Sequence, residues 1–111
     1  MLQADVSPLF GALADPTRLQ VVRLLGERPR RAGELARAVG TSPPAMSRHL
    51  RVLLWAGVVS DERPTDDART RVFRLRPESV AALRAWLDEL QAHWDEQLEA
   101  FKRHVEERTH E

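Results

Sequence analysis

The sequence predicts a single, mainly α-helical domain with a small β-hairpin and a long C-terminal helix. Three patterns support this fold class. Capping residues followed by proline open helices at three places within residues 1–57. Strand-like segments follow in residues 58–75, and an apolar stripe with helical spacing then runs through residues 77–108. We therefore divide residues 1–111 into a core at 7–76 and a C-terminal helix at 77–108.

Two of the three capping residues lie near the N-terminus. Ser7 and Asp15 each stand directly before a proline, the order expected of an N-cap and the first helical residue. In the helix after Asp15, Leu19 and Val22 are expected to face the core. Residues 26–31 (GERPRR) interrupt this helix and are expected to form a loop. Further candidates for the buried face are Val21, Leu24 and Leu25.

A helix-turn-helix is predicted next. Residues 34–39 form a short helix that ends at Gly40, a residue suited to the left-handed conformation of a helix end. Ser42, followed by two prolines, opens another helix, which ends at Gly57. Only a short turn with a glycine separates the two helices, as in a helix-turn-helix. The inward residues of the second helix are Met46, Leu50 and Leu53, with Leu54 beside them.

A hairpin follows the helix-turn-helix. Residues 58–63 and 70–75 are rich in strand-forming residues, and the polar segment 64–69 between them is typical of a turn. We expect two antiparallel strands, which in this position form a wing.

The last helix carries a long apolar stripe. Its residues follow one another at spacings of 4, 3, 4, 4, 3 and 4. Some 30 helical residues span about 45 Å, whereas a globule of the preceding 76 residues is about 25 Å across. Part of the stripe must therefore extend past its own domain, and another chain is expected to cover it. The stripe consists of Leu83, Leu87, Leu90, Trp94, Leu98, Phe101 and Val105.

Charge is divided along the chain although its net value is zero. Residues 1–76 carry 13 arginines against 8 acidic residues, a net charge of +5. Residues 77–111 carry 4 basic against 9 acidic residues, a net charge of −5. The first part suits a polyanion, and the second is expected to stay away from one.

Composition excludes several classes of protein. The chain has no cysteine, so it has neither disulfides nor thiolate metal ligands. It has no run of 18 apolar residues and no signal-peptide pattern, and we expect a cytoplasmic protein without a membrane segment. Glycine-rich phosphate loops and nucleophile motifs are absent, and the adjacent acidic pairs on the last helix point in different directions. We therefore expect no enzyme and no cofactor.

The ordered motifs together are similar to those of the ArsR-type winged helix-turn-helix regulators. The resemblance covers roughly residues 7–90. It implies a homodimeric, usually repressing, DNA-binding protein whose binding to its operator is altered by a signal. The motifs are LADPTR at 13–18, ELA at 34–36, SRHLRVL at 47–53, AGVV at 56–59, and the arginine-flanked hairpin.

The helix that begins at Ser42 is the expected DNA reader. Its first turn is small and polar, so the backbone can approach DNA closely, and we expect free amides and the helix dipole to favour phosphate there. Arg48 and His49 can reach base edges in the major groove, and Arg51 suits a phosphate. The residues of this first turn are Ser42, Pro44, Ala45 and Ser47.

The hairpin is expected to supply further cations. Arg69 and Arg71, with Arg63 opposite, can follow phosphates or enter a minor groove. The alternative is that neighbouring acidic residues pair with these arginines in the free protein. Those acidic residues are Asp61, Glu62, Asp66 and Asp67.

The first and last helices are expected to form the dimer interface. The separation of two recognition helices is then fixed, and the operator should be an imperfect inverted repeat with half-sites about one helical turn apart. The interface residues are Leu9, Phe10, Leu13, Trp86, Leu87, Leu90, Trp94, Leu98 and Phe101.

The sequence leaves open which signal alters DNA binding. Thiolate sensing is excluded, and we expect no metal site, although His93, His104 and Glu107 have a spacing similar to that of zinc sites in some family members. A zinc-responsive repressor and a winged protein-interaction module are the alternatives, and a small-molecule effector is a third open question. Trp55, where the family pattern is polar, either covers the junction of helix and hairpin or forms a pocket wall or partner contact.

Overall fold

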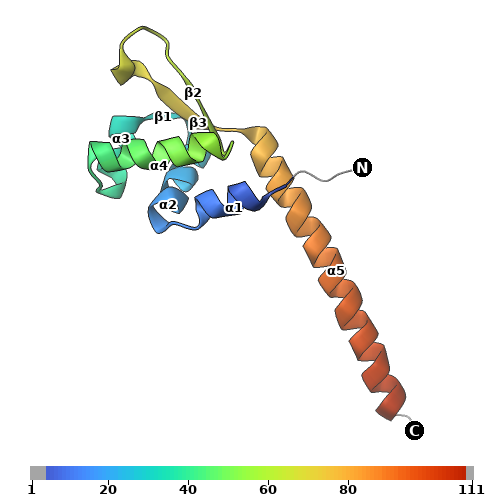
Figure 1. The fold of residues 1–111 in the computed structure, drawn as a ribbon. Helices are drawn as coiled ribbons and strands as arrows, with labels where there is room; N and C mark the ends of the chain where they lie inside the picture. Colours follow the sequence, from blue (N-terminus) through green and yellow to red (C-terminus); the bar gives the residue numbers. More distant parts are fainter. Residues whose placement is uncertain (1–4, 110–111) are drawn as a thin grey trace.

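The computed structural model describes residues 5–109, except for the side chain of Ala68. Five helices, three strands and a short 3₁₀ helix follow in the order α1, α2, β1, α3, α4, β2, η1, β3 and α5 within this part of the chain (Figure 1). Their bounds are α1 Ser7–Leu13, α2 Pro16–Glu27, β1 Arg30–Arg31, α3 Ala32–Val39, α4 Pro43–Trp55, β2 Val59–Glu62, η1 Ala68–Thr70, β3 Val72–Leu75 and α5 Pro77–Thr109.

Local capping explains several helix ends. The Asp15 carboxylate accepts from the backbone N–H groups of Thr17 and Arg18 and begins α2, as predicted. Gly40 ends α3 with a φ of 71°, and Gly57 follows α4 with a φ of 79°. The predicted role of Ser7 is wrong, because Val6 is the N-cap of α1 and the N–H of Ser7 itself donates to the Asp5 carboxylate at 2.9 Å.

The sheet has one strand more than predicted. Residues Arg30 and Arg31 form β1 instead of a loop, and β1 pairs antiparallel with β3. The sheet order is β1-β3-β2, so β3 is central, and β2 pairs with it from Val59 opposite Leu75 to Glu62 opposite Val72. The β2–β3 hairpin is the predicted wing.

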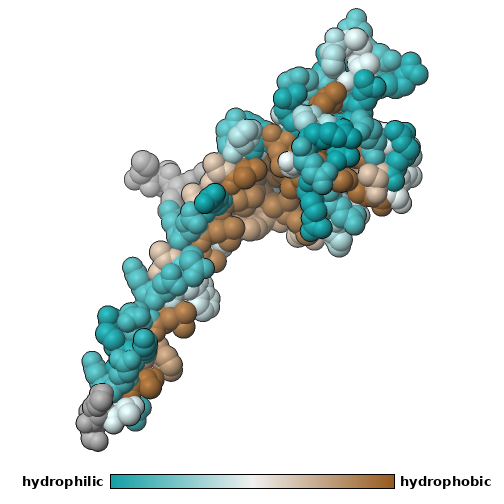
Figure 2. Space-filling model, turned by 180° about the vertical axis from the view of Figure 1, so that it is seen from behind, coloured by the Kyte–Doolittle hydropathy of each residue, from teal (hydrophilic) through white to brown (hydrophobic). Residues whose placement is uncertain are grey.

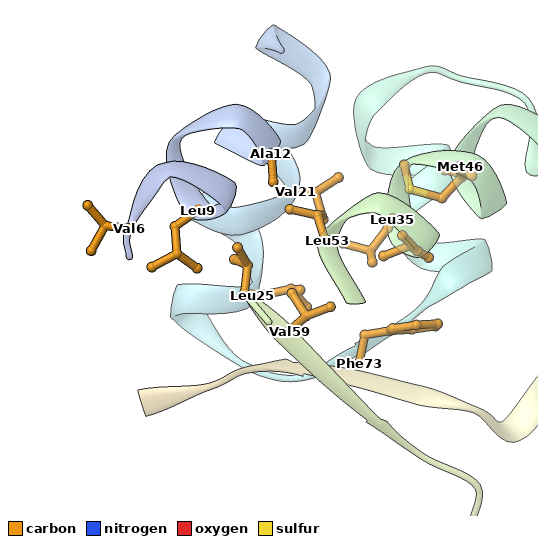
Figure 3. Close-up of a cluster of buried hydrophobic side chains, with 13 residues drawn as sticks. Val6, Leu9, Ala12, Val21, Leu25, Leu35, Met46, Leu53, Val59 and Phe73 are labelled. Carbon is orange, nitrogen blue, oxygen red and sulfur yellow. The ribbon is translucent and has the colours of Figure 1, made fainter. Parts of the chain in front are cut away.

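The core lies between the helices and the sheet (Figure 3). Leu35 of α3 and Met46 and Leu53 of α4 are fully buried there, together with Phe73 of β3. The prediction for α2 is partly wrong: Val21 and Leu25 are its buried residues, whereas Leu19 is exposed. The buried apolar set is Val6, Leu9, Ala12, Val21, Leu25, Leu35, Ala36, Met46, Leu50, Leu53, Val58, Val59 and Phe73.

Helix α5 leaves the body of the domain (Figure 1). Its first two turns are attached, because the Ser79 hydroxyl donates to the carbonyl of Gly57 and the side chain of Leu83 packs against the core. The molecule measures 74 × 34 × 20 Å and its radius of gyration is 20.0 Å, against about 13 Å for a compact chain of this length. None of the residues of α5 is buried in this single chain. The predicted overhang is confirmed.

We expect Leu35→Ala to destabilise the domain by about 2–5 kcal/mol, because it leaves a cavity in the centre of the core. Urea unfolding at a fixed protein concentration measures this loss. Arg23→Ala, on the exposed side of α2, is the control and should change stability by less than about 0.5 kcal/mol. A loss below about 1 kcal/mol for Leu35→Ala would contradict the core described here.

Candidate nucleic-acid interface

Helix α4 has one buried and one exposed side. Met46, Leu50 and Leu53 recur at helical spacing and are at most 2% exposed. Their burial turns Arg48 and Arg51 outward, and both side chains are exposed. Neither arginine forms a hydrogen bond or ion pair with another residue in the range 5–109. The exposed side of α4 is therefore cationic and uncompensated.

The start of α4 differs from the prediction. Ser42 caps the helix, since its hydroxyl oxygen accepts from the N–H of Ala45 at 3.2 Å. Pro43 and Pro44 have no N–H to offer, and the N–H of Met46 donates to the carbonyl of Ser42. No free amide is left between residues 43 and 46 for a phosphate. The expected contribution of free amides is therefore wrong, and the small exposed side chains and the helix dipole are what this turn offers.

His49 is held by the corner between α1 and α2. Its Nδ1 lies 3.3 Å from Nη1 of Arg18, and Nε of Arg18 donates to the carbonyl of Ala12. Because a guanidinium has no acceptor, Arg18 donates and the proton of a neutral His49 sits on Nε2. His49 is half-buried, unlike Arg48 beside it. This link between α2 and α4 has no local sequence signal.

The wing arginines are paired within the hairpin. Nε of Arg71 lies 2.6 Å from Oδ2 of Asp61, and its guanidinium lies over the ring of Phe73 at 4.8 Å. Arg69 pairs with Asp67 at 3.0 Å, with a side chain that is 90% exposed. The pairing that the sequence left as an alternative is thus present for both predicted arginines in the free protein.

Arg63 is the wing cation that the sequence places opposite Arg69 and Arg71. It is exposed and forms no ion pair within the described part of the chain. It lies beside Arg71 and Arg51 around a cavity of about 300 Å³ between α4 and the sheet.

The predicted dimer residues differ in burial. Leu9 and Leu13 of α1 lie in the core of their own chain, whereas Phe10 and the predicted residues of α5 are exposed. Leu9 is 7% exposed, so its assignment to the interface is corrected: it already packs inside its own core. Phe10 of α1 meets Trp86 of α5 edge to face, with ring centroids 5.0 Å apart. Leu13 is half-buried in the core.

The outer part of the α5 stripe stays open. Apolar side chains gather along one side of this helix and where it meets the helical body (Figure 2). Their exposed fractions are 51% for Leu87, 37% for Leu90, 57% for Trp94, 60% for Leu98 and 67% for Phe101.

Trp55 is 82% exposed at the end of α4, which excludes its role as a cover for the helix–hairpin junction. A contact between Trp55 and a partner stays a prediction.

Among residues 5–109, no group of three histidine, aspartate or glutamate side chains comes together as a metal site. His93 and His104 lie on one helix about 16 Å apart along its axis, so they cannot share an ion within one chain. No helix in the same range is long and apolar enough to cross a bilayer.

Residues 15–61 match the family model described as "Bacterial regulatory protein, arsR family". The HTH-type transcriptional regulator Rv2034 of Mycobacterium tuberculosis (strain ATCC 25618 / H37Rv) is 48% identical over 77 residues, which cover 69% of each protein.

The chain belongs to the ArsR family. It is accordingly a DNA-binding transcriptional regulator. The transcriptional repressor SdpR of Bacillus subtilis (strain 168) is 40% identical over 55 residues, or 50% of this ArsR-family chain and 61% of that protein. A crystal structure of the ArsR family transcriptional regulator RHA00566 superposes with a TM-score of 0.72 at 31% identity, covering 81% of this chain and 96% of the other. The winged helix-turn-helix fold is confirmed.

In the ArsR-family motif at 13–18, the carboxyl group of Asp15 makes the stability of the folded protein depend on pH. The backbone N–H of Arg18 donates to Asp15 and holds the pKa of this carboxyl below its usual value. Because the folded pKa is below the unfolded one, the stabilisation is present above the unfolded pKa, near 4, and is lost as the pH falls through the folded pKa.

Asp15→Asn keeps a side chain that can cap α2 and removes the charge. We expect a smaller loss of stability between pH 5 and about pH 2.5 than in the wild type, measured by urea unfolding across that range. Asp66→Asn, in the exposed turn of the hairpin, is the matched control. Parallel pH profiles for wild type and Asp15→Asn would contradict the role given to the carboxylate.

Proposed function

We propose that this ArsR-family regulator is a homodimeric repressor that binds an inverted-repeat operator. The observation that carries the proposal is the exposed side of α4, on which Arg48 and Arg51 have no partner while the opposite side is buried. A helix with this division can enter a major groove without unfolding or repacking. The relatives carry the names of transcriptional regulators, which favours regulation over catalysis.

We assign the contacts on α4 by exposure. Arg48 reads a base, because its guanidinium can donate two hydrogen bonds to guanine. Ser47 and Arg51 contact the DNA backbone, and the capped turn of Ser42, Pro44 and Ala45 lets it come close. His49 positions α4 through Arg18 and does not read a base itself. Nothing observed favours an interaction module without DNA binding.

The wing is proposed to follow a phosphate strand. Arg63 is exposed and unpaired within the described residues, and Arg69 is bound only to Asp67 at the tip. Both can turn to phosphate. Arg71 is held by Asp61 and Phe73, so we propose that it supports the wing and contributes less to DNA affinity.

Dimerisation is proposed to use the α5 stripe and the Phe10–Trp86 pair. An apolar surface of this extent is rarely left open by a monomer, and its near-heptad spacing suits a second helix. Two copies joined in this way present two α4 helices to successive turns of one face of DNA. The repressing role is supported by the name of SdpR.

Arg48→Ala should weaken binding to the cognate operator by about 1–3 kcal/mol and relax preference at one base pair. Fluorescence anisotropy at one fixed salt concentration, on the DNA upstream of the protein's own gene, measures both effects. Arg23→Ala is the control, because it removes an exposed arginine from α2. If Arg48→Ala binds DNA with unchanged affinity and unchanged base preference, Arg48 does not contact a base.

Leu98→Asp should convert the dimer into monomers, since it places a charge in the middle of the exposed stripe of α5. Sedimentation velocity at micromolar concentration distinguishes the two states. Glu99→Asp changes the neighbouring residue without altering its charge and should leave the dimer intact. A wild-type protein that sediments as a monomer would contradict the proposed homodimer.

A further inference from the structure

We propose that the cavity between α4 and the sheet binds a small organic anion with an apolar body, and that this ligand displaces DNA. The proposal rests on the proposed function for its regulatory consequence, but not for the binding itself. The cavity has a volume of about 300 Å³, at the lower end of the range for small-molecule sites. Its lining residues are Ala32, Ser47, Leu50, Arg51, Leu54, Arg63, Arg71 and Phe73.

The polar part of the cavity is cationic. Guanidinium groups come from Arg51 on α4 and from Arg63 and Arg71 on the hairpin. The Asp61 carboxylate, 2.6 Å from Arg71, neutralises one of the three. The other two have no acidic partner within residues 5–109, so the cavity carries a net positive charge. A carboxylate fits this arrangement, because guanidinium groups bind it through two parallel, charge-assisted hydrogen bonds.

The floor of the cavity is apolar. Leu50 and Phe73 are each 2% exposed and close the cavity from below. The apolar surface that a ligand can reach comes from Leu54 and Ala32, which are half-buried. A bare inorganic anion leaves this floor unused, whereas an alkyl or aryl group gains by covering it. The combination of a cationic rim and an apolar floor therefore favours an alkyl or aryl carboxylate over free phosphate.

The same groups are needed for DNA. Ser47 and Arg51 belong to the proposed contact side of α4, and Arg63 belongs to the proposed phosphate contacts of the wing. A carboxylate bound between them occupies the donors that a DNA phosphate would use. A ligand that binds only the DNA-free protein raises the apparent Kd of the protein for DNA. The rise grows with the ratio of the ligand concentration to the Kd of the ligand.

The binding test uses the full chain without DNA. Octanoate is titrated by calorimetry, and ¹H–¹⁵N spectra locate the site. Octan-1-ol tests the need for charge and inorganic phosphate tests the need for an apolar body. We expect saturable binding of octanoate, one per protomer, with shifts at Ser47, Arg51 and Phe73. Both control compounds should bind at least about tenfold more weakly.

Two variants make the test specific. Arg63→Gln removes an exposed guanidinium from the rim and should weaken octanoate binding by about tenfold or more. Arg23→Gln removes an exposed guanidinium from α2 and should leave the binding unchanged. Binding that is insensitive to Arg63→Gln, equal affinity for octan-1-ol, or shifts confined to the α5 stripe would each overturn the site.

Competition between octanoate and DNA is measured separately, by the fluorescence anisotropy of operator DNA with and without octanoate. We expect the apparent Kd for DNA to rise in wild type and in Arg23→Gln, and to respond less in Arg63→Gln. Octanoate that binds the cavity and leaves DNA affinity unchanged would overturn the displacement. Failure of the protein to bind any DNA, with octanoate still bound at the cavity, would contradict the proposed function and leave the ligand site standing.

Discussion

The packing of α4 against the core is the constraint on which the rest of the structure depends. Met46, Leu50 and Leu53 fix the rotation of the helix about its own axis, and the Ser42 cap and Gly57 fix its ends. A helix held at three buried positions and at both ends has no freedom to hide its remaining side chains. The exposure of Arg48 and Arg51 is therefore a consequence of apolar packing on the other side.

The division of charge follows the same geometry. The arginine-rich core carries α4 and the wing, and the acidic residues of α5 lie on a helix that leads away from the hairpin (Figure 1). Acidic residues repel a polyanion least when they lie far from it, and charges more than about 8 Å apart are largely screened at physiological salt. A neutral chain can thus present a local cationic surface.

The sequence predicted what short-range rules control. The caps at Asp15 and Ser42, the glycine at residue 40 and the stripe of α5 depend on neighbours within one or two turns. Strand β1 was missed because two residues become a strand only by pairing with β3, more than forty positions away. The burial of Leu9, the exposure of Leu19 and the contact between Arg18 and His49 likewise depend on how helices pack, and no spacing along the chain encodes it.

The two paired arginines of the wing have different consequences for binding. Arg69 and Asp67 form an exposed pair at the hairpin tip, and a pair of this kind contributes little stability in water. A phosphate can therefore replace Asp67 with little loss. Arg71 is also in contact with Phe73, whose ring is part of the core, and to withdraw it would disturb packing as well as an ion pair. The acids of the hairpin thus leave the tip available to DNA and fix the base of the wing in place.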